Sequence, residues 1–404
     1  MLASKPYKFE LMHLAFYDSP AEWQKMLPLS YTRPVADLRV GILKIHEKWA
    51  RHLQGSNTTF RSEEYLDALF APPQEKSLTI LGNVLPTDEL LTKVGELKGT
   101  DVLVYEDQIV AGYFEPDEAI ETTGRTVIHL PSISQVHYPW DLFSHNGQEL
   151  RKDFALLTAG RTSWDIVDLH TKTYGDNIFL EEGATVKAAI LNAENGPIYL
   201  GKDSEVQEGA LIRGPFALGE HSIVNMGGKM RGDNTIGPYC KVGGEVSNSV
   251  FQGFSNKGHD GFLGNSFIGE WCNLGADTNT SNLKNNYTNV KMWDFERNGF
   301  KDTGLQFCGL IMGDHSKCGI NTMFNTGTSV GVSANIFGEG FPRTIIPSFA
   351  WGGASGFSTY QTRKAFETAE LAMDRRGRKL TDGDRKVLSH IFERTAQYRV
   401  WEKK

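Results

Sequence analysis

Residues 200–242 read LGKDSEVQEGALIRGPFALGEHSIVNMGGKMRGDNTIGPYCKV. An apolar residue stands at every sixth position: Leu200, Val206, Ile212, Leu218, Val224, Met230, Ile236 and Val242. This period fits neither the 3.6-residue repeat of a helix nor the two-residue alternation of a strand. It is typical of a solenoid in which each hexapeptide forms one flat side of a triangular coil, with its apolar residue pointing to the axis. The stretch therefore predicts a hexapeptide-repeat parallel β-helix.

The same spacing extends beyond this stretch. A weaker form of the spacing precedes this stretch, at Leu180 and Val186. The spacing resumes after a first break at Phe262, Ile268 and Leu274, and after a second break at Met312, Cys318, Phe324, Val330 and Ile336. Glycine supports the assignment, because 31 of the 42 glycines lie in residues 175–356, where solenoid corners need unusual backbone angles. The breaks, at about residues 246–261 and 280–311, predict inserted loops that carry the functional site.

Composition excludes several classes of function. A length of 404 residues suits two or three domains, and a net charge of -7 argues against a nucleic-acid partner. The chain shows no secretory leader and no apolar run of membrane-spanning length, so we expect no membrane association. Its four cysteines are spaced for neither a zinc site nor a disulfide framework. We expect a cytoplasmic protein with reduced thiols.

The two ends differ from the repeat. Residues 1–155 alternate apolar runs with helical stretches and predict an α/β domain, with strands near 78–81 and 102–105 and helices near 39–53, 63–70 and 88–97. The repeat domain then covers residues 156–358, and residues 359–404 form basic helices. Residues 361–404 hold 12 Lys and Arg against 7 Asp and Glu. These helices either brace the solenoid or direct cations at the phosphates of a ligand.

Two segments in the repeat resemble a known family. KGHDGFLGNSFIG (residues 257–269) and EWCNLGADTNTSNLK (residues 270–284) are similar to the active-site region of the bifunctional N-acetylglucosamine-1-phosphate uridyltransferase and glucosamine-1-phosphate acetyltransferase family. The resemblance implies a nucleotidyltransferase-like α/β domain followed by a left-handed β-helix. It also implies a homotrimer that transfers an acetyl group from acetyl-CoA to an amino-sugar 1-phosphate.

The resemblance assigns roles in the solenoid residue by residue. His259 matches the general base, a role that suits a side chain titrating near neutral pH. Arg231 matches the arginine that binds the sugar phosphate. Asn273 and Asn282 match residues that orient the amino sugar and the acetyl group. Lys284 and Lys291 match further phosphate contacts. Ser247 and Phe262 depart from the family lysine and tyrosine, which places the sugar specificity in question.

A second resemblance lies near the N-terminus. LPLSYTRP (residues 27–34) is similar to a motif of sugar nucleotidyltransferases, but the glycine-rich phosphate loop that precedes it in the family is absent. Lys25, Arg33 and Arg39 are the candidate nucleotide-binding cations. Asn83 stands where the family has a magnesium-binding aspartate, and an amide is a weaker ligand for Mg²⁺ than a carboxylate.

These patterns support three hypotheses. The first is a transferase with a sugar 1-phosphate, a nucleoside triphosphate and acetyl-CoA as substrates, which performs nucleotidyl transfer, amino-sugar acetylation or both. The second is a nucleotidyltransferase, similar to thymidylyltransferases acting on glucose 1-phosphate, whose solenoid serves only for oligomerisation. The third is a non-catalytic scaffold.

Overall fold

The computed structural model describes residues 13–55 and 57–402. Residues 1–12, which belong to the stretch considered for a secretory leader, and the last two lysines lie outside the described residues. The chain divides into two compact units. The α/β unit comprises Met1–Met26, Arg33–Leu38 and Leu43–His137. The solenoid unit comprises Leu27–Thr32, Arg39–Ile42 and Tyr138–Lys404. The main division between the two units thus falls after residue 137, and the C-terminal helices belong to the solenoid unit.

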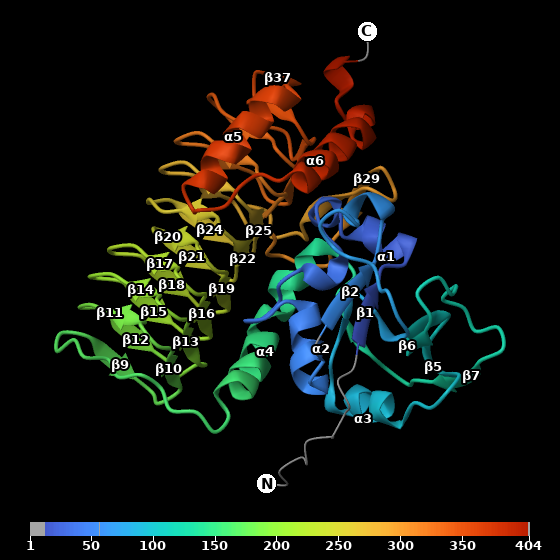
Figure 1. Ribbon diagram of the computed structural model, residues 1–404. Helices are drawn as coiled ribbons and strands as arrows, with labels where there is room; N and C mark the ends of the chain where they lie inside the picture. The colour runs from blue at the N-terminus through green and yellow to red at the C-terminus, as the bar shows by residue number, and fades with distance from the viewer. Residues whose placement is uncertain (1–12, 56, 403–404) are drawn as a thin grey trace. The chain divides into compact units, whose positions relative to one another are not determined.

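The α/β unit is built on a six-stranded sheet with strand order β2-β1-β3-β6-β5-β7 (Figure 1). The strands are β1 (His13–Tyr17), β2 (Asn57–Arg61), β3 (Ser77–Leu81), β5 (Asp101–Tyr105), β6 (Gln108–Phe114) and β7 (Thr126–His129). The first three are mutually parallel, and β3 is buried along its whole length, as expected of a central strand. A separate pair joins β4 (Val84–Leu85) to β8 (Ser134–Gln135).

The helices of this unit are α1 (Pro20–Lys25), α2 (Ile45–Leu53) and α3 (Asp88–Glu96). The strands near 78–81 and 102–105 and the helix near 88–97 are confirmed. The helix near 39–53 is shorter than expected, because residues 39–42 pack in the solenoid unit. The helix near 63–70 is wrong: only a single 3₁₀ turn forms, at Glu64–Leu66.

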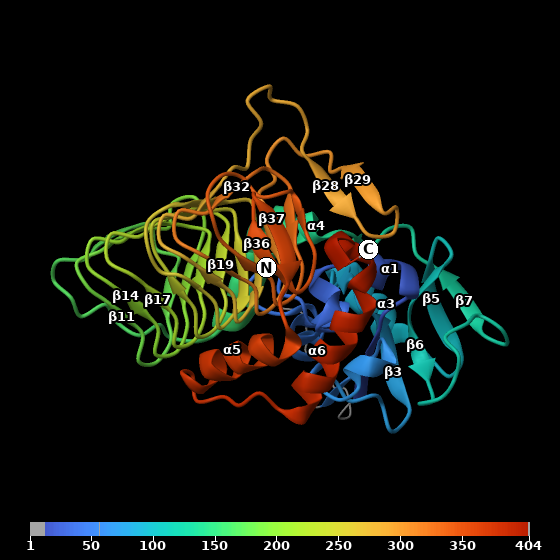
Figure 2. The same cartoon turned by 90° about the horizontal axis from the view of Figure 1, so that it is seen from above.

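The solenoid consists of three parallel sheets that stack strand upon strand (Figures 1 and 2). The first contains β10 (Ile178–Leu180), β13 (Ile198–Leu200), β16 (Phe216–Leu218), β19 (Asn234–Ile236), β22 (Val250–Gly253), β25 (Phe267–Glu270), β30 (Leu310–Met312), β33 (Thr328–Val330) and β35 (Ile345–Ile346). The second contains β11 (Thr185–Val186), β14 (Glu205–Val206), β17 (Ile223–Val224), β20 (Lys241–Val242), β23 (Asn256–Lys257), β26 (Asn273–Leu274), β31 (Lys317–Cys318), β34 (Asn335–Ile336), β36 (Ala350–Gly353) and the antiparallel β37 (Gly356–Thr359). The third contains β9 (Lys172–Tyr174), β12 (Ile190–Asn192), β15 (Leu211–Arg213), β18 (Lys229–Arg231), β21 (Glu245–Ser247) and β24 (Phe262–Gly264).

The axis of the solenoid is filled by the residues of the six-residue period. All eight apolar residues from Leu200 to Val242 are at most 2% exposed, which confirms the predicted parallel β-helix. One expectation is wrong: Phe262 faces outward in register with Glu245, and Leu263, fully buried, takes the axial position. The spacing shifts because the coil from Glu245 to Phe262 spans 17 residues, one fewer than the regular coil from Leu211 to Lys229. Lys257 also occupies an axial position: it pairs with Val242 and is 1% exposed.

Further elements complete the solenoid unit. Helix α4 (Pro139–Thr158) packs on β19, β22 and β25, where its buried Asn146 accepts hydrogen bonds from Gly41 N and Thr235 Oγ1. The second break forms β27 (Asn279–Thr280), which pairs with β32 (Met323–Phe324), and the antiparallel hairpin β28 (Lys291–Asp294) and β29 (Gly299–Asp302) (Figure 2).

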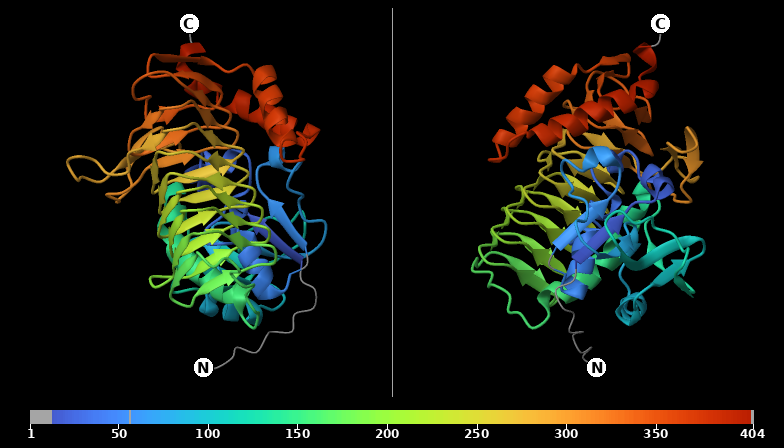
Figure 3. Two further views of the ribbon diagram at one scale, coloured as in Figure 1. Left: turned by 90° about the vertical axis from the view of Figure 1, so that its left-hand side faces the viewer. Right: turned by 45° about the vertical axis from the view of Figure 1, so that its right-hand side comes forward.

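Helices α5 (Thr362–Asp374) and α6 (Asp382–Arg394) lie against the solenoid coils (Figure 3). Arg376 between them donates to Asn256, and Phe392 packs edge-on against Phe349. These contacts favour the bracing role among the two expected for the basic helices. All four cysteines are buried and unpaired. Among the helices that the structure describes, none has the length and apolar character needed to cross a membrane.

The stacked axis makes a prediction about stability. Phe251 is fully buried between Ile236 and Ile268, so Phe251→Ala should lower the free energy of unfolding by about 3–5 kcal/mol. Urea denaturation measures this loss. Ile320→Ala, at a side chain that is 71% exposed, is the control and should change stability by no more than about 0.5 kcal/mol. Equal losses in the two variants would contradict the stacked core.

Candidate functional site

His259 lies at a corner of the solenoid, between β23 and β24. The corner encloses a pocket of about 530 Å³, lined by Gln207, Asn225, Met226, Gly244, Gly258, His259, Asp260, Ala276 and Asp277. These residues follow second-sheet strands of successive coils, so the stacking of coils builds the pocket. The imidazole is exposed, and within residues 13–55 and 57–402 no hydrogen bond engages it. It is therefore open to a reactant in the pocket.

Glycines keep this corner open. Gly244 has a φ of +66°, and a Cβ there would lie 2.6 Å from the carbonyl oxygen of Gly261 and 2.9 Å from that of His259. Only glycine adopts this conformation without strain and without displacing the loop. Asn225 lies two coils before Gly258. Its Nδ2 donates to the carbonyl oxygen of Gly258 at 2.7 Å and fixes the backbone before His259.

The pocket wall carries two exposed carboxylates. Asp260 follows His259 directly, and Asp277 lies one coil further, with its backbone N–H bonded to the carbonyl oxygen of Asp260 at 3.1 Å. Two negative charges beside an open imidazole favour a positively charged reactant, such as a protonated amine. Sequence reasoning did not single out Asp260 or Asp277, although the regular coil length places them at this corner once the register is known.

The interior side of the same corner is held by Lys257. Its Nζ donates to the carbonyl oxygens of His259 at 2.8 Å, Asp260 at 3.1 Å and Gly243 at 3.4 Å. Burial lowers the pKa of Lys257 to about 8, and the nearby Asp260, Cys318 and Asp277 offset only part of this shift. The ammonium is thus charged at neutral pH despite its position in the solenoid axis.

This pKa makes stability depend on pH with a defined sign. Between about 8 and the ordinary value of 10.5 the unfolded chain binds more protons at Lys257 than the folded chain, so stability rises with pH. Across this window the wild type should gain roughly 3 kcal/mol relative to Lys257→Met. Urea denaturation of both proteins at several pH values measures the difference. A difference that stays constant or falls as pH rises would contradict the assignment.

The other solenoid residues assigned by resemblance do not line this pocket. Arg231 ends β18, is 68% exposed and pairs with Glu245 at 2.6 Å. Asn282 Nδ2 donates to Asn265 Oδ1 at 2.8 Å. Asn265 directly follows Gly264, which stands in register with Ser247 and Arg231 at the carboxyl ends of the third-sheet strands.

The remaining three lie elsewhere. Asn273 is exposed on β26, in register with Asn256 and Lys317 on the second sheet. Lys284 donates to the carbonyl oxygen of Asn289 at 2.7 Å, and Lys291 is exposed at the start of β28. Within one chain, the structure thus separates His259 from the residues expected to bind its substrate.

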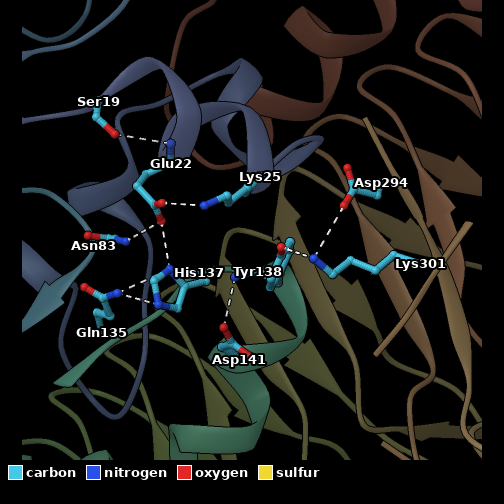
Figure 4. Close-up of polar contacts among 10 residues, drawn as sticks. All are labelled: Ser19, Glu22, Lys25, Asn83, Gln135, His137, Tyr138, Asp141, Asp294 and Lys301. Carbon is cyan, nitrogen blue, oxygen red and sulfur yellow. Dashed lines mark hydrogen bonds and ion pairs between the residues drawn. The ribbon is translucent and has the colours of Figure 1, made fainter. Parts of the chain in front are cut away.

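The α/β unit contains a second candidate site, a polar cluster around Glu22 (Figure 4). The Glu22 carboxylate accepts from Lys25 Nζ at 2.7 Å and from Asn83 Nδ2 at 2.7 Å, and its Oε2 lies 3.0 Å from His137 Nδ1. Burial raises the pKa of Glu22, but the bonds from His137 and Lys25 outweigh this effect and hold the pKa below its ordinary value.

The cluster lies where ligands usually bind in a parallel sheet. Glu22 and Lys25 are on α1, which follows β1, and Asn83 lies in the turn after β3, so both segments sit at the carboxyl ends of parallel strands. Asn83 is 1% exposed, and its Oδ1 has no hydrogen-bond partner among the described residues. Two residues predicted from the sequence, Lys25 and Asn83, thus both bind Glu22. Glu22 and His137 were not among the residues predicted from the sequence.

The residues around Asn83 do not fit Mg²⁺. A magnesium ion requires several oxygen ligands, usually with one or two carboxylates, and the carboxylate that contacts Asn83 is already bound to an ammonium group. Nor do the described residues contain a group of three or more His, Cys, Asp or Glu side chains that could hold a metal ion. The magnesium ligand expected at Asn83 is therefore not supported by its surroundings.

The two arginines expected to bind nucleotide are buried with structural partners. Arg33, 4% exposed, pairs with Asp37 at 2.7 Å in the α/β unit. Burial raises the pKa of Asp37, but Lys44, His46 and Arg33 together hold it well below its ordinary range. Arg39, in the solenoid unit, donates from Nε to Gln252 O at 3.2 Å, from its backbone N–H to Gln252 Oε1 at 3.0 Å, and to Ile42 O. Arg39 thus ties residues 39–42 to β22.

Comparisons with known proteins found a family model, curated relatives and solved structures that are similar to parts of this chain. A family model for sugar nucleotidyl transferase matches residues 14–162. The bifunctional protein GlmU of Methanocaldococcus jannaschii is 34% identical over 87 residues, which are 22% of this chain and 21% of that protein. A bifunctional sugar-1-phosphate nucleotidylyltransferase/acetyltransferase of Sulfurisphaera tokodaii is 30% identical over 177 residues, 43% of each chain. The matched regions thus span less than half the length of these curated relatives.

Two solved structures of acyltransferases are also similar. The polySia-specific acetyltransferase NeuO is 15% identical with a TM-score of 0.25, over 49% of this chain and 86% of that one. The Arabidopsis UDP-N-acetylglucosamine acyltransferase is 14% identical with a TM-score of 0.21, over 58% and 76%. Residues 14–162 thus match the family model for sugar nucleotidyl transferase, and parts of the chain are similar to bifunctional nucleotidyltransferases and acetyltransferases.

Proposed function

We propose that this protein is a transferase of amino-sugar nucleotide synthesis, in which the solenoid transfers an acetyl group from acetyl-CoA to an amino-sugar 1-phosphate. The observation that carries the proposal is the open imidazole of His259 in a pocket of about 530 Å³, beside Asp260 and Asp277. The four unpaired cysteines and the need for acetyl-CoA support a cytoplasmic location.

The geometry supports a simple mechanism. Asp260 and Asp277 attract the protonated amino group of the acceptor, which becomes a nucleophile once it has lost one proton to solvent. His259 removes a second proton as the neutral amine nitrogen attacks the carbonyl carbon of the thioester. The new C–N bond forms, the C–S bond breaks, and the proton passes from the imidazole to the departing CoA thiolate. Bound in this way, the acceptor amine and the acetyl group are held together, so the reaction becomes effectively unimolecular.

The substrate-binding residues point to a shared site. Because Arg231, Asn273, Asn282, Lys284 and Lys291 lie outside the pocket of their own chain, we place some of them at the His259 pocket of a neighbouring copy in a homotrimer. Light scattering tests the trimer. A mixture of refolded His259→Asn and Arg231→Ala chains should regain part of the wild-type activity, because some mixed sites contain neither substitution. No recovery in a confirmed mixed trimer would overturn the shared site.

The α/β unit is proposed to transfer a nucleotidyl group to a sugar 1-phosphate, on the strength of its family match and the Glu22 cluster. Lys25 is positioned to bind phosphate, whereas Arg33 and Arg39 are assigned structural roles. Pyrophosphate release from UTP, dTTP or ATP with a sugar 1-phosphate tests this activity, with and without added Mg²⁺. No release with any of the three would leave acetyl transfer as the single activity.

A further inference from the structure

A charged residue occupies one position of the solenoid axis. In the second sheet Val206, Val224 and Val242 stack in register, and the next position of the column is Lys257, which is 1% exposed. An ammonium group in an apolar column is unfavourable unless polar partners compensate for the lost water. In the described part of the chain no carboxylate forms an ion pair with Lys257. Its compensation comes from backbone carbonyl groups.

These carbonyl groups belong to the pocket corner. Lys257 bonds to the oxygens of His259 and Asp260 in its own coil and to that of Gly243 in the preceding coil. The Asp260 oxygen also accepts from Asp277 N, whereas the oxygens of His259 and Gly243 have no other donor among the residues that the structure describes. Removal of the ammonium would leave both without a partner.

Apart from Lys257, the described residues form hydrogen bonds with the loop that carries His259 at Gly258, Asp260 and Gly261 but not at His259 itself. Gly258 and Gly261 flank His259 and Asp260, and Gly261 has a φ of +107°, a conformation open mainly to glycine. Such a loop has several accessible conformations unless hydrogen bonds select one. Asn225 fixes its start, and Lys257 fixes the residues that face the pocket.

We propose that Lys257 is a positioning residue, whose ammonium group holds the His259 loop from inside the solenoid in the conformation that presents the imidazole and Asp260 to the acceptor amine. The effect on catalysis rests on the proposed acetyl transfer, whereas the effect on the loop does not. Lys257 itself is buried and does not touch a reactant.

The test compares Lys257→Met with Lys317→Met in the full chain. Methionine fills the axial space without a donor. Lys317 is a matched control, because it also bonds to backbone carbonyl oxygens at a solenoid corner, those of His315 at 3.0 Å and Trp271 at 3.5 Å, but outside the pocket. Hydrogen exchange of peptides covering residues 258–264, followed by mass spectrometry, measures how well the loop is held. Steady-state kinetics of acetyl transfer measure the effect of the loop on catalysis.

Lys257→Met should raise exchange in residues 258–264 about tenfold, whereas Lys317→Met should leave it unchanged. In an active enzyme, kcat should fall about tenfold or more with an unchanged KM for acetyl-CoA, since the loop and not the CoA site is altered. Unchanged loop exchange in Lys257→Met would overturn the proposal, and so would raised exchange with unchanged kcat. If the wild type transfers no acetyl group, the proposed function fails, but the exchange result still decides the role of Lys257. If Lys257→Met does not fold, Lys257→Gln, which keeps one donor group, is tested by the same two measurements.

Discussion

Replacement of His259 by asparagine should lower kcat for acetyl transfer by about 10²–10⁴-fold, the usual contribution of a general base. The side chain is exposed in the pocket and has no protein partner among the described residues, so its loss removes no packing. We therefore expect an unchanged thermal unfolding midpoint and an unchanged KM for acetyl-CoA.

Steady-state release of the CoA thiol, with glucosamine 1-phosphate as acceptor, measures the effect. His170→Ala, at an exposed histidine in the solenoid unit, is the control and should retain wild-type kcat. A His259→Asn variant with wild-type kcat would remove His259 from the mechanism. A variant that also unfolds at lower temperature would instead indicate a structural role.

Replacement of Glu22 by alanine should destabilise the α/β unit by about 3 kcal/mol and abolish nucleotide or sugar-phosphate binding there. Glu22 is 2% exposed, and its removal leaves Lys25, Asn83 and His137 without their shared acceptor. The loss is costly chiefly at Asn83, which is 1% exposed, because its amide group loses its carboxylate acceptor without gaining water.

Hydrogen exchange in β3 during urea titration of the full chain reports on this unit specifically. Glu96→Gln is the control, because Glu96 pairs with Lys93 at an exposed position and its loss should cost no more than about 1 kcal/mol. Equal effects of the two substitutions on β3 would show that the Glu22 cluster does not hold the unit together.

The six-residue period was sufficient to predict the solenoid, because each axial residue contacts its equivalents in neighbouring coils and must be apolar and of limited size. The prediction erred where the coil length changes. The coil from Val246 to Leu263 is 17 residues long, so the axial position falls on Leu263 instead of Phe262. Lys257 was missed for a related reason, since a lysine in the axial column is visible only once the strand register is known.

The candidate sites differ in how far sequence could reveal them. His259 was found through its resemblance to a family motif, and its neighbours Asn225 and Asp277 follow from the coil length. The Glu22 cluster joins residues 61 and 115 positions apart, which only the pairing of β1 with β3 and of β4 with β8 brings together. The sequence does not reveal the partners of Arg39, because its cationic charge fits a phosphate as well as it fits the carbonyl oxygens of Gln252 and Ile42.

The role of the solenoid pocket is tested most directly by incubating the wild-type chain with acetyl-CoA and glucosamine 1-phosphate, and following CoA thiol and acetylated sugar together. We predict that the two products form in equal amounts, that thiol release requires the acceptor amine, and that His259→Asn reduces both. Thiol release at the same rate without the acceptor, or at the same rate in wild type and His259→Asn, would contradict acetyl transfer at this pocket.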